Sequence, residues 1–303
     1  MSRYSPTLLT PPPEEEEVYP YRPVWISLII ESTILIAVSL IFFVTYDILG
    51  FSLTGVPALA VNVTLALLPM SLWLIISIYR ERRALEPRHN LLTVFIITAL
   101  AANAIGIPAI NDFFKVDQWL SLSSTLDRII GYAFSVGVTH ELIKYLVIRY
   151  TVWDQHFRIR EDAVAYAIAS SLGFATVLNL HFISNGTPPA NIVIFRIVAI
   201  YTIHISATII VSYGLSELKF NPSSLILMPF MLAVAILYTG VAIPLRAGVI
   251  NAGFFLGEAQ QNQLFAVFLP IILLVVPCVA IAFLYSNAER RQREAAISNE
   301  ASV

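Results

Sequence analysis

The sequence predicts an all-α polytopic membrane protein, and its composition is the first reason. Of the 303 residues, 57% are hydrophobic and only 13% are charged, whereas soluble domains carry roughly 25% charged residues. Lysine plus arginine (18) nearly balance aspartate plus glutamate (20), which excludes a nucleic-acid-binding protein. The single cysteine excludes a disulfide scaffold and a cysteine metal motif.

The second reason is the length of the apolar stretches. A bilayer core of about 30 Å needs about 20 residues of helix, and about eight stretches qualify. The flanking segments are polar, so we expect a disordered acidic tail over 1–22, a transmembrane domain over 23–286 and a polar C-terminal tail over 287–303. The predicted spans cover residues 24–46, 56–79, 91–111, 129–152, 162–184, 191–215, 223–243 and 263–286.

The third observation is that basic residues gather in every second loop. By the positive-inside rule these loops lie in the cytoplasm, and an even number of spans then places both termini there. We expect an integral protein of the plasma membrane of a prokaryote, surrounded by lipid bilayer. The basic residues are Arg80, Arg82, Arg83 and Arg88 after the second span, Arg149, Arg158 and Arg160 after the fourth, Lys219 after the sixth, and Arg290, Arg291 and Arg293 after the eighth.

Several predicted spans contain ionisable side chains, which cost several kcal/mol inside a membrane unless they are paired or face a cavity. In the fourth span, His140 and Glu141 lie four and three residues before Lys144, spacings that share a helix face. At about 1.5 Å per residue, Glu141 lies roughly 18 Å from the outer end of its span, and His204, in the sixth span, roughly 20 Å. A carboxylate and an imidazole converging at mid-membrane would bind zinc or share a water.

Two further polar residues lie farther outward. Asn179 in the fifth span can hydrogen-bond across helices or to a substrate backbone, and small residues around Gly173 in that span predict close helix packing. Arg196 lies about two turns outward of His204. Structural roles stay open for all of these: an ion pair for Lys144, a helix-to-helix hydrogen bond for His204 and an interfacial arginine for Arg196.

The order of these residues between about 129 and 216 resembles the PrsW family of intramembrane proteases, relatives of the CAAX-prenyl protease group. In that family a helix carries Glu-Glu-x-x-Lys, and the next helix opens with Asp, passes through Gly-Phe-Ala and ends in Glu-Asn. An Arg and a membrane-embedded His follow. The counterparts here are His140-Glu141-x-x-Lys144, Asp162, Gly173-Phe174-Ala175, Leu178-Asn179, Arg196 and His204.

Three positions depart from the family pattern. His140 replaces the first Glu, and Leu178 replaces the Glu of Glu-Asn. The family's later His has no counterpart, because the nearest stretch in the seventh span offers Tyr238 or Thr239 instead. His140 is itself a good zinc ligand, although adjacent residues project about 100° apart on a helix, so that His140 and Glu141 cannot both aim squarely at one point.

The resemblance implies an intramembrane metalloprotease that hydrolyses a peptide bond of a membrane-anchored protein, using a metal-activated water in a cavity between helices. It implies a divalent metal, zinc, with Glu141 as general base or ligand and with Asn179 or Arg196 stabilising the oxyanion. The implied metal ligands are His140, Glu141 and His204, and the implied catalytic residues are Glu141, Lys144, Asn179 and Arg196.

Two other functions stay open. A catalytically inactive pseudoprotease of the same fold would bind transmembrane helices without cutting them, and the replaced carboxylate at Leu178 favours it. A proton-coupled or anion transporter would also use intramembrane Glu, Lys, Arg and His. The sequence shows no inverted repeat of the kind that many transporters contain.

Overall fold

The computed structural model describes residues 24–84, 87–120, 124–186, 188–220, 226–251 and 263–301. Over these ranges the chain is almost entirely helical and forms no strand, which confirms the all-α prediction. The acidic tail predicted over 1–22 lies outside the described residues.

The helices follow one another along the chain. α2 (Val24–Phe42) continues into the π-helical η2 (Phe43–Ile48), and α3 (Gly55–Trp73) continues through η3 (Leu74–Ile78) to α4 (Tyr79–Glu81). α5 (Leu91–Ala101), η4 (Ala102–Gly106), η5 (Ala109–Phe113) and α6 (Val116–Trp119) come next, followed by α7 (Thr125–Tyr132), η7 (Ala133–Gly137) and α8 (Val138–Thr151). The short α9 (Trp153–His156) precedes α10 (Arg160–Ser184), α11 (Ala190–Phe220), α12 (Leu227–Asn251) and α13 (Gln263–Ala301).

Seven helical stretches of the described chain are long and apolar enough to cross a membrane, and they correspond to seven of the eight predicted spans. The remaining prediction, 129–152, corresponds to the unbroken helical run from α7 to α8. Its length is sufficient, but His140, Glu141 and Lys144 lower its mean hydropathy. The stretch that is least typical of a span is therefore the one that carries the polar side chains.

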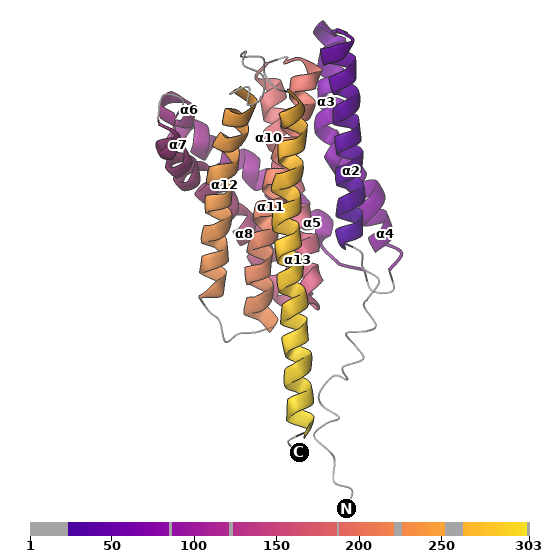
Figure 1. Ribbon diagram of the computed structural model, residues 1–303, viewed down its shortest axis with the longest axis vertical. Coiled ribbons are helices and arrows are strands. Elements are labelled where there is room, and N and C mark those ends of the chain that lie inside the picture. The colour runs from indigo at the N-terminus through magenta and orange to yellow at the C-terminus, as the bar shows by residue number, and fades with distance from the viewer. Residues whose placement is uncertain are drawn as a thin grey trace, which may run out of the picture.

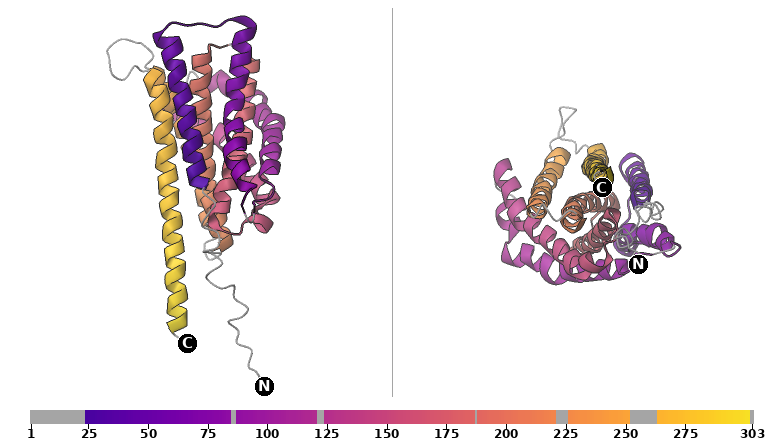
Figure 2. Two further views of the ribbon diagram at one scale, coloured as in Figure 1. Left: turned by 90° about the vertical axis from the view of Figure 1, so that its right-hand side faces the viewer. Right: turned by 90° about the horizontal axis from the view of Figure 1, so that it is seen from below.

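α10 and α11 form the centre of the bundle, and the other helices surround them (Figure 2). In their apolar stretches 83% and 89% of the residues are buried, compared with 22–33% in the other five spanning stretches. Their small and β-branched side chains pack on all sides, whereas the outer helices expose large apolar side chains such as Ile29, Val56 and Ile75. An apolar outer surface of this kind faces lipid.

Two glycines bring neighbouring helices close together. A Cβ on Gly173 would lie 2.2 Å from the Phe95 carbonyl oxygen, so α10 approaches the backbone of α5 as closely as only glycine allows. This confirms the close packing that the small residues of the fifth span predict. A Cβ on Gly240 would lie 2.5 Å from the Ala133 Cβ, so α12 packs tightly on η7 and brings the residue before it, Thr239, toward α8.

The first turn of α2 and the last turns of α13 lie at the same end of the bundle, and α13 projects beyond it (Figure 1). The predicted polar tail, 287–303, is helical as far as Ala301 and continues α13. That this end faces the cytoplasm stays a prediction.

Candidate active site

A buried ion pair on α8 meets a histidine of α11. Lys144 Nζ lies 2.7 Å from Glu141 Oε1 and 3.2 Å from His204 Nδ1. Glu141 and Lys144 are fully buried, and His204 is 1% exposed. The three-residue spacing of Glu141 and Lys144 and the matching depth of His204 are what bring the groups together. We refer to these three residues as the α8–α11 cluster.

The main chain of α11 is fixed at this point by side chains. The His204 carbonyl oxygen accepts hydrogen bonds from Ser171 Oγ of α10 (3.0 Å) and from Thr208 Oγ1 (2.8 Å), and Lys144 Nζ lies 3.4 Å away. Ser171 is one of the small residues around Gly173 that predict close helix packing. No sequence signal separates it from its neighbours.

His140 of α8 lies beside the cluster without forming a hydrogen bond to it in the described residues. Its ring centroid is 4.5 Å from that of Phe174 and 5.1 Å from that of His204. Neither ring nitrogen of His140 has a hydrogen-bond partner among the described residues. Adjacent helical residues project about 100° apart, so His140 points to one side of Glu141.

Thr239 of α12 is a cluster neighbour that sequence reasoning did not include among the site residues. Its Oγ1 donates to Glu141 Oε1 over 3.2 Å, and the residue is fully buried. The stretch that contains it stands where the family carries its later His. The match in position to the family's later His was the only sequence signal for a site residue here, and it did not decide between Tyr238 and Thr239.

Asn179 and Arg196 do not join the cluster. Among the described residues, no hydrogen bond or ion pair links either of them to Glu141, Lys144 or His204. The Arg196 guanidinium lies 4.2 Å above the Phe182 ring, and the buried Asn179 Oδ1 has no partner in the described part of the chain. Arg196 lies eight residues before His204 on α11, and Asn179 lies eight residues after Ser171 on α10, which in each case is about 12 Å along the helix axis.

The predicted metal ligands supply suitable donors. His140, Glu141 and His204 are residue types that hold zinc, and Glu141 Oε2 and both His140 ring nitrogens are buried without partners in the described residues. Yet no three His, Cys, Asp or Glu side chains of the described ranges come together as a metal-binding group. The Lys144 ammonium already contacts two of the three ligands. The arrangement therefore fits an ammonium group and not a metal ion, which would have to displace Lys144.

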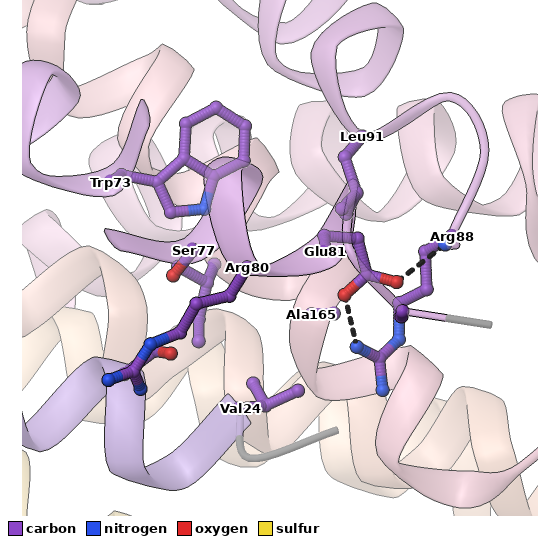
Figure 3. Close-up of a pocket in the computed structure, with 11 residues that line it drawn as sticks. Val24, Trp73, Ser77, Arg80, Glu81, Arg88, Leu91 and Ala165 are labelled. Atoms are coloured by element: carbon purple, nitrogen blue, oxygen red, sulfur yellow. Dashed lines mark hydrogen bonds and ion pairs between the residues drawn. The ribbon is translucent and has the colours of Figure 1, made fainter. Parts of the chain in front are cut away.

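A network of ion pairs holds the start of α10. Arg88 Nε lies 2.7 Å from Asp162 Oδ1, and Arg88 Nη1 lies 2.8 Å from Glu81 Oε2, the latter pair being visible in Figure 3. Asp162 Oδ2 also accepts the Arg158 and Ile159 backbone N–H groups, which caps the helix. This carboxylate, part of the motif that resembles the family, therefore has a structural role.

A second buried pair joins α10 to α11 at the same end of these helices. Arg160 Nε lies 2.8 Å from Glu217 Oε1, and both side chains are at most 5% exposed. Removing one partner from such a pair costs about 3–5 kcal/mol. The Arg160–Glu217 pair holds together α10 and α11, the helices that supply Ser171 and His204.

Comparison with known proteins identifies the kind of protein that carries this site. The family model described as PrsW family intramembrane metalloprotease matches residues 86–276, more than half of the chain and all of the cluster. No curated protein and no solved structure matches. The family implies a divalent metal and a substrate embedded in the membrane. With its apolar helices, the chain is an integral membrane protein, and it belongs to the PrsW family of intramembrane metalloproteases.

Proposed function

We propose that the protein hydrolyses a peptide bond of a membrane-anchored protein at the α8–α11 cluster, in the plasma membrane of a prokaryote. One observation carries this proposal: Glu141 is fully buried with one carboxylate oxygen engaged and the other free. Oε1 contacts Lys144 and Thr239, while Oε2 has no partner in the described residues. A buried carboxylate with a free oxygen is suited to accept a proton from water.

In the proposed reaction Glu141 Oε2 takes a proton from a water as the water oxygen attacks the carbonyl carbon of the scissile bond. The proton then passes to the leaving amide nitrogen, the carbon–nitrogen bond breaks, and a carboxylic acid and an amine result. Lys144 supplies the positive charge nearest to the developing oxyanion. Asn179 and Arg196, about 12 Å outward, are assigned to binding the substrate segment and not to the oxyanion.

No step of this mechanism uses a metal, because the residues as arranged do not fit one. Zinc held by His140, Glu141 and His204 stays a prediction from the family resemblance. It requires that Lys144 leave Glu141 and His204 first.

The proposal is tested with the full chain expressed in membranes of a bacterial host, incubated in water enriched in oxygen-18. Mass spectrometry of the membrane proteins identifies new carboxyl termini, each of which takes one labelled oxygen on hydrolysis. We expect labelled termini with the wild type and none with Glu141→Gln. Leu142→Ala, a change at the half-exposed neighbour of Glu141, is the matched control. Equal labelling with Glu141→Gln would contradict the assignment.

A second candidate, a pseudoprotease that binds transmembrane helices, is favoured by the closed cluster. Lys144 contacts both Glu141 and His204, and all three side chains are buried. Absence of labelled termini from the wild type, with the protein folded, would favour this candidate.

A further inference from the structure

Two arginines of neighbouring helices lie outward of the α8–α11 cluster. Arg196 of α11 and Arg246 of α12 are close enough for their positive charges to repel each other. Arg196 is eight residues before His204, and Arg246 is seven residues after Thr239. Each spacing corresponds to about 10–12 Å along the helix axis. We refer to Arg196 and Arg246 as the arginine pair.

Arg246 lies on the face of α12 that carries Thr239, because seven residues are close to two helical turns. The lipid-facing side of α12 is marked by Leu237, Val241 and Leu245, which are 56%, 42% and 42% exposed. Arg246 is half-buried and projects about 100° away from Leu245. It therefore shares the side of α12 from which Thr239 contacts Glu141.

Arg196 is held against α10 and within electrostatic reach of the cluster. Its guanidinium lies 4.2 Å above the Phe182 ring of α10, and its charge acts on His204. The adjacent Phe195 and Ile197 are 6% and 1% exposed, whereas Arg196 is half-buried. Its Nε is enclosed, but its terminal Nη1 and Nη2 are neither enclosed nor hydrogen-bonded to a described residue. These two nitrogens can therefore contact a ligand.

The arginine pair has no counter-ion in the described part of the chain. No Asp or Glu side chain of the described ranges forms an ion pair with either guanidinium, whereas Arg88 and Arg160 each contact a buried carboxylate. Charged groups within a membrane domain are costly unless they are paired, and two like charges close together add to that cost. A bound anion would compensate both charges.

A carboxylate of a protein segment fits this position better than a lipid phosphate, because Arg246 is turned away from the lipid-facing side of α12. Guanidinium groups bind carboxylates through paired N–H donors. A separation of about 10–12 Å from the cluster corresponds to about three residues of an extended chain. We therefore infer that the arginine pair binds an Asp or Glu side chain of the substrate, about three residues outward of the bond that is cut. The inference rests on the proposed function, but the binding step needs no hydrolysis.

The inference is tested by the binding of a synthetic transmembrane peptide. The probe is a fluorescent Leu/Ala helix of about 21 residues with one Asp about five residues from an end, which matches the depth of Arg196 six residues after the start of α11. A matched peptide has Asn in place of Asp. Affinities are measured by fluorescence anisotropy with the full chain, both wild type and Glu141→Gln, in mixed micelles of a neutral detergent and phosphatidylcholine.

We expect the Asp peptide to bind about tenfold more tightly than the Asn peptide, since hydrogen bonds to charged groups are stronger than neutral ones. Tenfold corresponds to about 1.4 kcal/mol. The preference should be equal in the wild type and in Glu141→Gln, which does not cut in the proposed mechanism. Arg196→Gln and Arg246→Gln should each reduce it strongly. Arg82→Gln, at an exposed arginine that follows α4, is the matched control and should leave it unchanged.

Equal affinities of the two peptides for the wild type would overturn the inference, and this comparison needs no variant to fold. An unchanged Asp preference in folded Arg196→Gln and Arg246→Gln would also overturn it. The other occupant is tested by replacing phosphatidylcholine with phosphatidylglycerol. Loss of the Asp preference on this replacement would show that an anionic lipid headgroup occupies the arginine pair instead.

Failure of the proposed function gives a different result. Absence of oxygen-18-labelled termini would contradict hydrolysis, while a preference for the Asp peptide would still support the anion site. Labelled termini together with equal peptide affinities would contradict the inference on the arginine pair alone.

Discussion

Lys144 is the residue on which the α8–α11 cluster depends. Lys144→Met leaves the Glu141 carboxylate buried without its partner, and breaking such a pair costs about 3–5 kcal/mol. We expect a loss of this size in the free energy of unfolding, measured in detergent with a chelator present. Lys115→Met, at an exposed lysine, is the control and should have little effect. A Lys144→Met variant as stable as the wild type would show that the pair contributes nothing.

The same substitution tests what the cluster binds. Because the Lys144 ammonium contacts Glu141 and His204, its removal frees two of the predicted zinc ligands, with His140 beside them. We expect little zinc in the purified wild type and about one zinc per chain in Lys144→Met supplied with zinc, measured by elemental analysis. Stoichiometric zinc in the wild type would mean that Lys144 moves aside and that the metal site of the family is retained.

Sequence reasoning found the residues of the cluster but not their contacts. Spacing placed Glu141 and Lys144 on one face, and depth arithmetic placed His204 at their level. Which side chain occupies the space between helices depends on helix rotation, to which hydropathy is insensitive. For that reason the sequence pointed to a metal where the structure has an ammonium, and Thr239 was not chosen.

At the scale of the helices, the position of the cluster depends on how closely α10 approaches α5. Gly173→Ala would place a methyl group 2.2 Å from the Phe95 carbonyl oxygen, a backbone atom. Overpacking of this kind costs about 1–3 kcal/mol, so we expect a lower midpoint of thermal unfolding. Gly186→Ala, where a Cβ meets nothing within 4 Å, is the control. Equal midpoints for the two variants would show that α5 moves away freely.

The spans themselves were largely predictable because length and apolar composition are what a bilayer demands. Which of the helices pack at the centre of the bundle was not predictable. A high mean hydropathy does not mark α10 and α11 as the central pair, since their values of 1.6 and 2.0 do not exceed the 2.0–2.7 of the outer helices. The small residues of α10 were the one signal of a central position, and the structure confirms it at Gly173.

For the molecule as a whole, the ion pairs show that three of its loops meet at one end. Arg88 follows α4 and pairs with Asp162 near the start of α10, while Arg160 pairs with Glu217 near the end of α11. The last turns of α13, which include Arg290, lie at this end as well (Figure 1). Most loop arginines are therefore concentrated on one side, and the positive-inside rule predicts that this side faces the cytoplasm.

This orientation is tested by cysteine labelling of intact bacterial cells in a Cys278→Ala background. Gly186 lies just beyond the end of α10, 24 residues after Asp162, which is roughly 36 Å along a helix. Because Asp162 and Arg290 lie at the same end of the bundle, Gly186 lies at the opposite end. We expect a membrane-impermeant maleimide to label Gly186→Cys in intact cells and Arg290→Cys, whose native side chain is 72% exposed, only after permeabilisation. The reverse pattern would invert the topology. Labelling of both residues in intact cells would place them on the same side of the membrane, which contradicts the three crossings by α11, α12 and α13 between them.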